Sequence, residues 1–145
     1  MRLVFRGHNG RPRVQRVSLQ RLQQVSGNRR QDRGYFHNHG SCQVRGERLL
    51  ISFRPTIYLN QALSGDERTE VLRHEQEHFT DFQDLARDFK DSLEDAVAGG
   101  SLDNDEVDRR WAWFLYDVCS ASAALHRREG GLVEHCFRPS GSRPR

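Results

Sequence analysis

The chain has few of the residue patterns that form membrane spans and zinc fingers, namely long apolar runs and closely spaced cysteines. Only 35% of its 145 residues are hydrophobic, and no apolar run is long enough to cross a bilayer. The three cysteines, Cys42, Cys119 and Cys136, form no C-x-x-C pair, so the sequence predicts no zinc finger. These absences argue against a membrane protein and favour a single small domain with a modest core.

Lysine is almost absent too. Lys90 is the only one among 23 Lys and Arg, which face 20 Asp and Glu and leave a net charge of +3. The arginines are concentrated at the start of the chain, where residues 1–33 contain nine against a single acid, Asp32. Such a basic segment can contact nucleic acid or an acidic partner. No RNA- or DNA-binding signature accompanies it, so we do not expect nucleic acid to be the partner.

A signal peptide is not recognisable, because residues 1–6 (MRLVFR) turn to charge at once. We therefore expect a cytoplasmic protein, or one exported by another route. An odd number of cysteines leaves at least one free thiol. If the compartment is oxidising, Cys42 and Cys136 are a candidate disulfide pair, although the sequence does not establish the pairing.

The first half of the chain reads as short strands around one short helix. Ser18 is a suitable N-cap for a helix with Leu19, Leu22 and Val25 on one side. Residues 26–40 are polar and punctuated by glycine, which is typical of a loop. Pro55 suggests that the extended segment after it is an edge strand or a bend. The expected strands are 2–6, 12–17, a hairpin of 42–44 with 49–53, and 56–59.

Two long helices are predicted in the second half, over about residues 65–97 and 103–129. Ser64 and Glu67 have the spacing of a capping box at the start of the first, and Gly99-Gly100 ends it. The second helix begins near Asp103 and ends at Gly130-Gly131. The expected fold is α+β, with a small antiparallel sheet packed on two long helices. Residues 1–137 form one domain, and 138–145 a disordered tail.

The first long helix contains the pentapeptide His74-Glu75-Gln76-Glu77-His78, an H-E-x-x-H motif. Two histidines four residues apart lie on one helical face, so both imidazoles can reach one metal ion. At 100° per residue, His74, Glu75 and His78 lie on or beside the apolar stripe of the helix. An accidental motif on the surface would more often lie on the polar face.

This constellation suits a zinc peptidase. Two neutral imidazoles are zinc ligands, and zinc lowers the pKa of its water to about 7. Glu75 would be the general base that takes the proton from the attacking water and passes it to the leaving amine. We therefore expect zinc-dependent hydrolysis of a peptide or protein substrate.

The order of elements resembles the minimal zincin layout, in which an edge strand precedes the active-site helix and a later helix or loop supplies the third ligand. Residues 54–59 (RPTIYL) and 73–79 (RHEQEHF) are also similar to a group of small bacterial predicted zinc-dependent proteases. The similarity covers about residues 49–90 and is specific at H-E-Q-x-H-F. The layout implies that an extended substrate pairs with the strand 56–59 above the metal.

The sequence leaves the identity of the third zinc ligand undecided. The longer metzincin motif is absent, because Asp81 stands where its glycine would be and Asp84 where its third histidine would be. Continued helix carries Asp84 away from the histidine face. On the second long helix, His126 is our first choice and Glu129 the alternative. Other candidates are Asp108, Glu134 and His135.

Two further features lie outside the ligand set. Asp81 follows His74 by two turns on the same face, so its carboxylate can hydrogen-bond a ligand histidine. His37 and His39 form a second histidine pair, which we interpret as exposed loop residues rather than ligands.

Two hypotheses compete with the peptidase. One is a zincin-like domain that binds metal without catalysis, and the other is a basic nucleic-acid-associated protein in which the motif is incidental.

Overall fold

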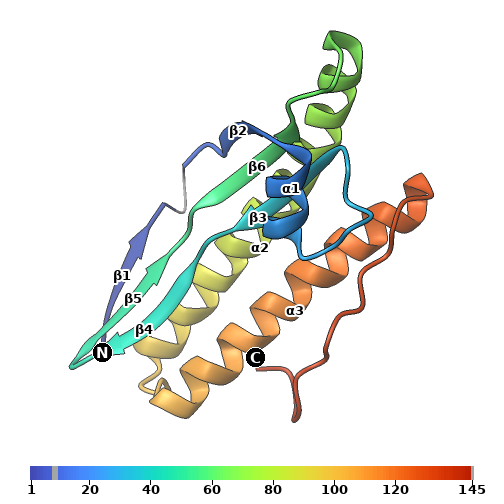
Figure 1. Cartoon of the computed structure of the whole chain (residues 1–145). Helices are drawn as coiled ribbons and strands as arrows, with labels where there is room; N and C mark the ends of the chain where they lie inside the picture. The colour runs from blue at the N-terminus through green and yellow to red at the C-terminus, as the bar shows by residue number, and fades with distance from the viewer. Residues whose placement is uncertain (8–9, 145) are drawn as a thin grey trace. The chain divides into compact units, whose positions relative to one another are not determined.

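The computed structural model describes residues 1–7 and 10–144, and it has the predicted α+β architecture (Figure 1). The described residues form six strands and three helices, two of them long. They divide into two compact units, each with its own three-stranded sheet. Within the described residues, no helix is both long and apolar enough to span a membrane.

One unit, here called the motif unit, comprises Asn9–Gly40 and Phe53–Thr80. Its sheet has the order β2-β6-β3, formed by β2 (Arg13–Val17), β6 (Pro55–Asn60) and β3 (Gly34–Asn38). The central strand β6 runs parallel to β2 and antiparallel to β3. Ile57 and Leu59 of β6 pack against Val71 of helix α2. On the other side of the sheet, α1 (Leu19–Ser26) contacts β3 and β6 (Figure 1).

The second unit, here called the α3 unit, comprises Met1–His8, Ser41–Ser52 and Asp81–Arg145. Its sheet has the order β1-β5-β4, with β5 (Arg48–Ser52) parallel to β1 (Arg2–Arg6) and antiparallel to β4 (Ser41–Arg45). Aromatic rings join the later part of α2 to α3. Phe89 lies 4.7 Å from Phe114 and 5.7 Å from Trp111, between ring centroids.

Both long helices lie close to where the sequence predicts them. Helix α2 extends over Gly65–Ala98 and α3 over Asn104–Glu129. The capping box is confirmed. The Glu67 N–H donates to Ser64 Oγ (3.3 Å), and the Ser64 N–H donates to Glu67 Oε1 (3.1 Å). At the other end, Gly100 adopts a left-handed conformation with φ 71°, which a glycine reaches without steric cost.

The predicted hairpin is confirmed, but the sheets are mixed rather than antiparallel. Strands β4 and β5 pair antiparallel across Gly46-Glu47, where Gly46 has φ 61°. The parallel partners, β1 with β5 and β2 with β6, are more than 35 residues apart in the chain. Alternation within a strand reveals its two faces but not its partner. The prediction therefore found these strands without their pairing.

The prediction that residues 56–59 form an edge strand was wrong, since β6 is central in its sheet. Pro55 is the first residue of the strand, where a missing N–H interrupts little of the ladder. The loop predicted over residues 26–40 was also wrong in part, because Gly34–Asn38 form β3 on one side of β6. Pairing with the apolar β6 overrides the polar composition of that segment.

The segment after α3 contains no helix or strand over residues 131–144. It includes most of the predicted disordered tail, whose last residue, Arg145, lies outside the described residues. Within this tail the Arg143 guanidinium pairs with Asp117 of α3 (2.6 Å) and lies 4.4 Å from the centre of the Trp113 ring.

Candidate metal site

The motif residues lie on the inner face of α2, as the apolar stripe predicted. Glu75 and His78 are buried, with 3% and 6% of their surface exposed, and His74 is half-buried. The two rings approach each other closely, with their Nε2 atoms 3.1 Å apart. One turn of helix therefore presents two imidazole nitrogens at the same place, as binding of one metal ion requires.

Strand β3 comes into close contact with α2 at the catalytic candidate. A Cβ atom placed on Gly34 would lie 3.3 Å from both Cγ and Oε1 of Glu75, and 2.5 Å from Cγ1 of Val71. Only a residue without a side chain fits there without displacing Val71. The backbone of β3 therefore closely approaches the Glu75 side chain. Sequence reasoning missed Gly34, although a glycine in a strand is a signal of close backbone approach.

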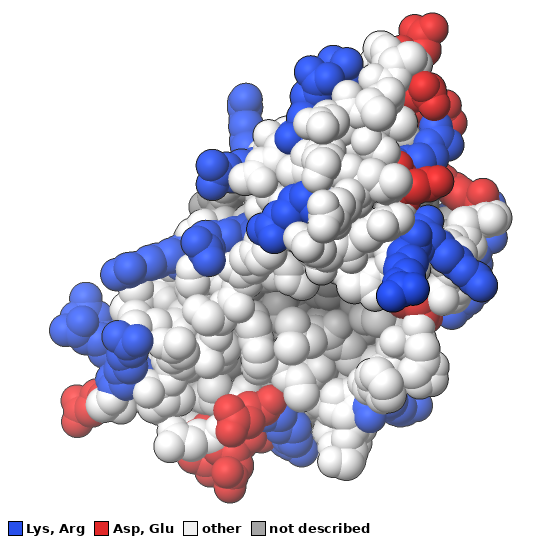
Figure 2. Space-filling view, viewed as in Figure 1, with Lys and Arg blue, Asp and Glu red and all other residues white. Residues whose placement is uncertain are grey.

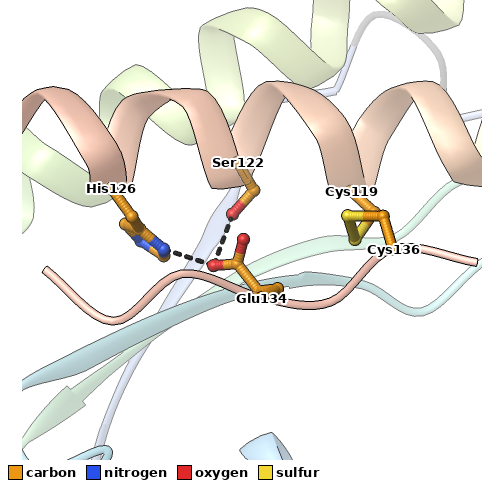
Figure 3. The surroundings of a disulfide bond; sticks show 5 residues. All are labelled: Cys119, Ser122, His126, Glu134 and Cys136. Atoms are coloured by element: carbon orange, nitrogen blue, oxygen red, sulfur yellow. Dashed lines mark hydrogen bonds and ion pairs between the residues drawn. A yellow bond between two sulfur atoms is a disulfide. The ribbon is translucent and has the colours of Figure 1, made fainter.

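His126, the first choice for third ligand, lies on α3 three residues before its end. Its Nδ1 contacts Oε1 of Glu134, a residue of the segment after α3, and the two form an ion pair when the ring is protonated (Figure 3). The same carboxylate oxygen accepts a hydrogen bond from Ser122 Oγ at 3.2 Å. Burial of the Glu134 carboxyl raises its pKa, but the hydrogen bond and charge of His126, assisted by Ser122, outweigh burial and hold the pKa below its ordinary value.

The three histidines chosen from the sequence form a candidate ligand set. His74, His78 and His126 each offer one ring nitrogen, and these three atoms lie within 4.8 Å of one another. Three imidazoles are a ligand set that zinc accepts, and they leave a fourth coordination position open for water or substrate. The residues present therefore fit a zinc ion.

Glu129 and Asp84 are both exposed. Glu129 is the last residue of α3. It does not belong to the cluster of three histidines. Asp84 is exposed and pairs with Arg87 at 3.4 Å, in agreement with its predicted direction away from the histidine face. Asp81 is half-buried on α2. Its hydrogen bond to a ligand histidine stays a prediction.

The second histidine pair occupies the opposite face of the β2-β6-β3 sheet from Glu75. In β3 the side chains alternate, so Gly34 faces α2 while His37 faces the other side. His39, just after the strand, hydrogen-bonds through Nε2 to the hydroxyl of the buried residue Tyr58 at 2.6 Å. The rings of His37 and His39 lie 4.6 Å apart. This pair is thus separate from the motif histidines, and His37 is exposed as predicted.

Both rings are partly shielded from water, and this partial burial lowers the pKa of His37 and His39 below the value of an unperturbed histidine. A second cause is the charge that His39 places beside His37. For His39 the second cause is the positive charge of Arg54, followed by that of Arg21. Both histidines are therefore more readily neutral than a free imidazole.

The disulfide joins Cys119 to Cys136, and the suggested Cys42–Cys136 pair was wrong. Cys119 lies on α3, and the segment after the helix returns alongside it, which brings Cys136 to a Cα–Cα distance of 5.8 Å (Figure 3). Cys42 lies on β4 as a free thiol. Burial, with a smaller effect from the charge of Asp108, raises the pKa of Cys42 to about 11.

All nine arginines of residues 1–33 are exposed. On the face drawn in Figure 2, basic side chains stand in several groups with uncharged surface between them. They do not form one continuous patch on that face. The expectation that nucleic acid is not the partner stays a prediction.

Comparisons with protein-family models, with curated proteins and with solved structures find no match to this chain. The geometry of its own residues therefore has to carry any functional argument.

Proposed function

We propose that the chain is a zinc-dependent metallopeptidase in which His74, His78 and His126 bind the metal and Glu75 is the general base. The observation that carries the proposal is the convergence of three imidazole nitrogens within 4.8 Å, from residues far apart in the sequence. An incidental H-E-x-x-H motif gives no reason for a third histidine at that place.

The chemistry follows from the roles of the protein groups. A zinc ion held by three neutral imidazoles would acidify a water and polarise the carbonyl of a peptide bond. Glu75 would accept the proton of the attacking water and deliver it to the nitrogen of the leaving amine, so that it ends each cycle ionised again.

The central position of β6 changes the expected place of the substrate, since only β2 and β3 are edge strands of that sheet. The Asn60 N–H donates to the Arg33 carbonyl (2.9 Å), and the His39 N–H donates to the Arg54 carbonyl (3.0 Å). The odd-numbered residues from 33 to 39 therefore form the backbone hydrogen bonds to β6. Phe36, which lies between them, directs its N–H and C=O to the outer edge of β3. A peptide paired with that edge would lie on the strand that contacts Glu75.

The test compares two glutamates of the same motif. Glu75→Gln keeps the shape of the side chain but removes the base, so we expect stoichiometric zinc by elemental analysis and a loss of peptide cleavage of at least about 100-fold. Glu77→Gln is the matched control, because Glu77 is partly exposed and pairs with Arg73 at 3.0 Å. It should leave both zinc content and cleavage unchanged. His74→Ala and His126→Ala should each lose zinc and activity.

The outcomes separate the hypotheses. In one outcome, the wild type and the glutamate variants all bind zinc while the histidine variants do not. If none of them then cleaves any peptide in a mixed library, the result would favour a metal-binding module without catalysis. Full zinc content in His74→Ala would exclude the site altogether. Absence of zinc together with salt-sensitive binding to DNA or RNA would favour the nucleic-acid hypothesis.

A further inference from the structure

One face of α3 carries three residues that meet the segment following the helix. Cys119, Ser122 and His126 are spaced by three and four residues, so their side chains project from the same side of α3. The chain turns at Gly130, with φ 73°, and runs back along this face (Figure 3). Cys136 then bonds to Cys119.

Two residues before that bond, Glu134 points at the helix. Its Oε1 atom lies between two groups of α3, the Nδ1 of His126 and the hydroxyl of Ser122, which is 3.2 Å away. A carboxylate that accepts a hydrogen bond from Nδ1–H selects the tautomer in which Nε2 keeps its lone pair for a metal. It also fixes the orientation of the ring. Glu134 thus prepares His126 to use Nε2 as a ligand.

The backbone that carries Glu134 has no secondary structure of its own. Residues 131–144 lie outside every helix and strand, so no ladder of hydrogen bonds holds them against α3. The covalent bond two residues away is the nearest firm attachment. Without it, Glu134 would sample many positions, and its contact with His126 would be made only part of the time.

We propose that the Cys119–Cys136 disulfide and Glu134 act together to position His126 for metal binding. Glu134 is a positioning residue and not a ligand, and the disulfide acts through it. This inference rests on the proposed metal site, which the disulfide and Glu134 would regulate. It makes the zinc affinity of the chain depend on the oxidation state of two cysteines that do not touch the metal.

The experiment measures zinc affinity by competition with a chelator in a double-mutant cycle. Loss of a carboxylate that supports a ligand histidine weakens metal binding by about 10–100-fold. We expect that loss in Glu134→Ala and a loss of similar size in Cys119→Ser with Cys136→Ser. The triple variant should bind no more weakly than the weaker of the two, because both changes remove the same contact. Glu134→Gln, which retains an acceptor oxygen, should recover part of the affinity.

Two controls isolate this effect from general damage. Cys42→Ser alters the remaining cysteine and should leave zinc affinity unchanged. The melting temperature of the metal-free protein separates positioning from folding, since Glu134→Ala should lower the affinity with little change in melting. If the serine variants do not fold, the wild-type disulfide can be reduced with a phosphine, which yields two thiols and takes up the oxygen of water as phosphine oxide. The affinity should then fall by the same factor.

Several results would overturn the inference. Unchanged zinc affinity in Glu134→Ala, or in the folded protein without its disulfide, would show that the segment does not position His126. Losses that multiply in the triple variant would show that the disulfide acts by another route. If the wild-type chain binds no zinc at all, the proposed function fails and this inference fails with it.

Discussion

Single atoms decide how closely the elements of the motif unit approach each other. Gly34 is required because β3 contacts α2 at Glu75, and any side chain there would collide with Val71. The same close contact buries the Glu75 carboxylate. A sequence shows that a glycine is present, but the reason for it is a pair of neighbours, Val71 and Glu75, that lie 37 and 41 residues further along the chain. The glycine could have indicated a close backbone approach, but not the residues that it approaches.

Cys42 offers a test of burial at the same scale. Since its pKa is raised to about 11, only about 0.1% of the thiol is ionised at pH 8, and thiolate is the reactive form. We expect iodoacetamide to modify Cys42 slowly at pH 8 and about tenfold faster with each further pH unit until about pH 11. Mass spectrometry of the non-reduced protein follows this one thiol, because Cys119 and Cys136 are bonded.

The charge of Asp108 contributes to that shift, so Asp108→Asn should lower the pKa of Cys42 and speed its alkylation at pH 8. Alkylation of the wild-type protein at pH 8 at the rate of a free thiol such as glutathione would contradict the assignment.

At the scale of elements, helices were predicted more accurately than strands. Each signal at the ends of α2 consists of residues that are close together in the sequence. The capping box begins the helix and the glycine pair ends it, and both acted as expected. Strands depend on partners. β3 looked like a loop because its pairing with β6 is not visible in its own residues. β6 looked like an edge strand because a proline begins it, although strands lie on both sides.

The N-cap of α2 gives a prediction about helix stability. Ser64→Ala removes the acceptor for the Glu67 N–H and should lower the free energy of unfolding by about 1 kcal/mol, measured by urea denaturation. Ser64→Gly is the matched control. Glycine tolerates the N-cap backbone and lets water reach the freed N–H, so it should cost only about 0.3 kcal/mol. Equal losses in the two variants would show that the hydroxyl does not act as the cap.

For the whole molecule, protonation of the second histidine pair should oppose folding. The pKa values of His37 and His39 are lowered in the folded state from 6.5, mainly by burial. Between those lowered values and 6.5 the unfolded chain binds more protons than the folded chain. The free energy of unfolding should therefore fall as the pH drops through 6.5, and level off below the folded pKa values.

The measurement is a series of urea denaturation curves of the metal-free protein between pH 8 and pH 5. A variant with His37→Gln and His39→Gln should show a shallower fall over this range, and the difference between the two curves reports the pair. The variant also loses the bond to Tyr58, which shifts its curve as a whole but not its slope. Identical slopes would contradict the prediction.

Local signals in the residues were sufficient for the α+β class, the two long helices and the buried face of the motif, because periodicity and caps act within a few residues. His126 as third ligand stays a prediction. The pairing of parallel strands, the Cys119–Cys136 bond and the contact of Glu134 with His126 were not predictable in this way. Each joins groups whose proximity depends on how the chain returns on itself. The path of the folded chain selects one arrangement among several that the sequence pattern allows.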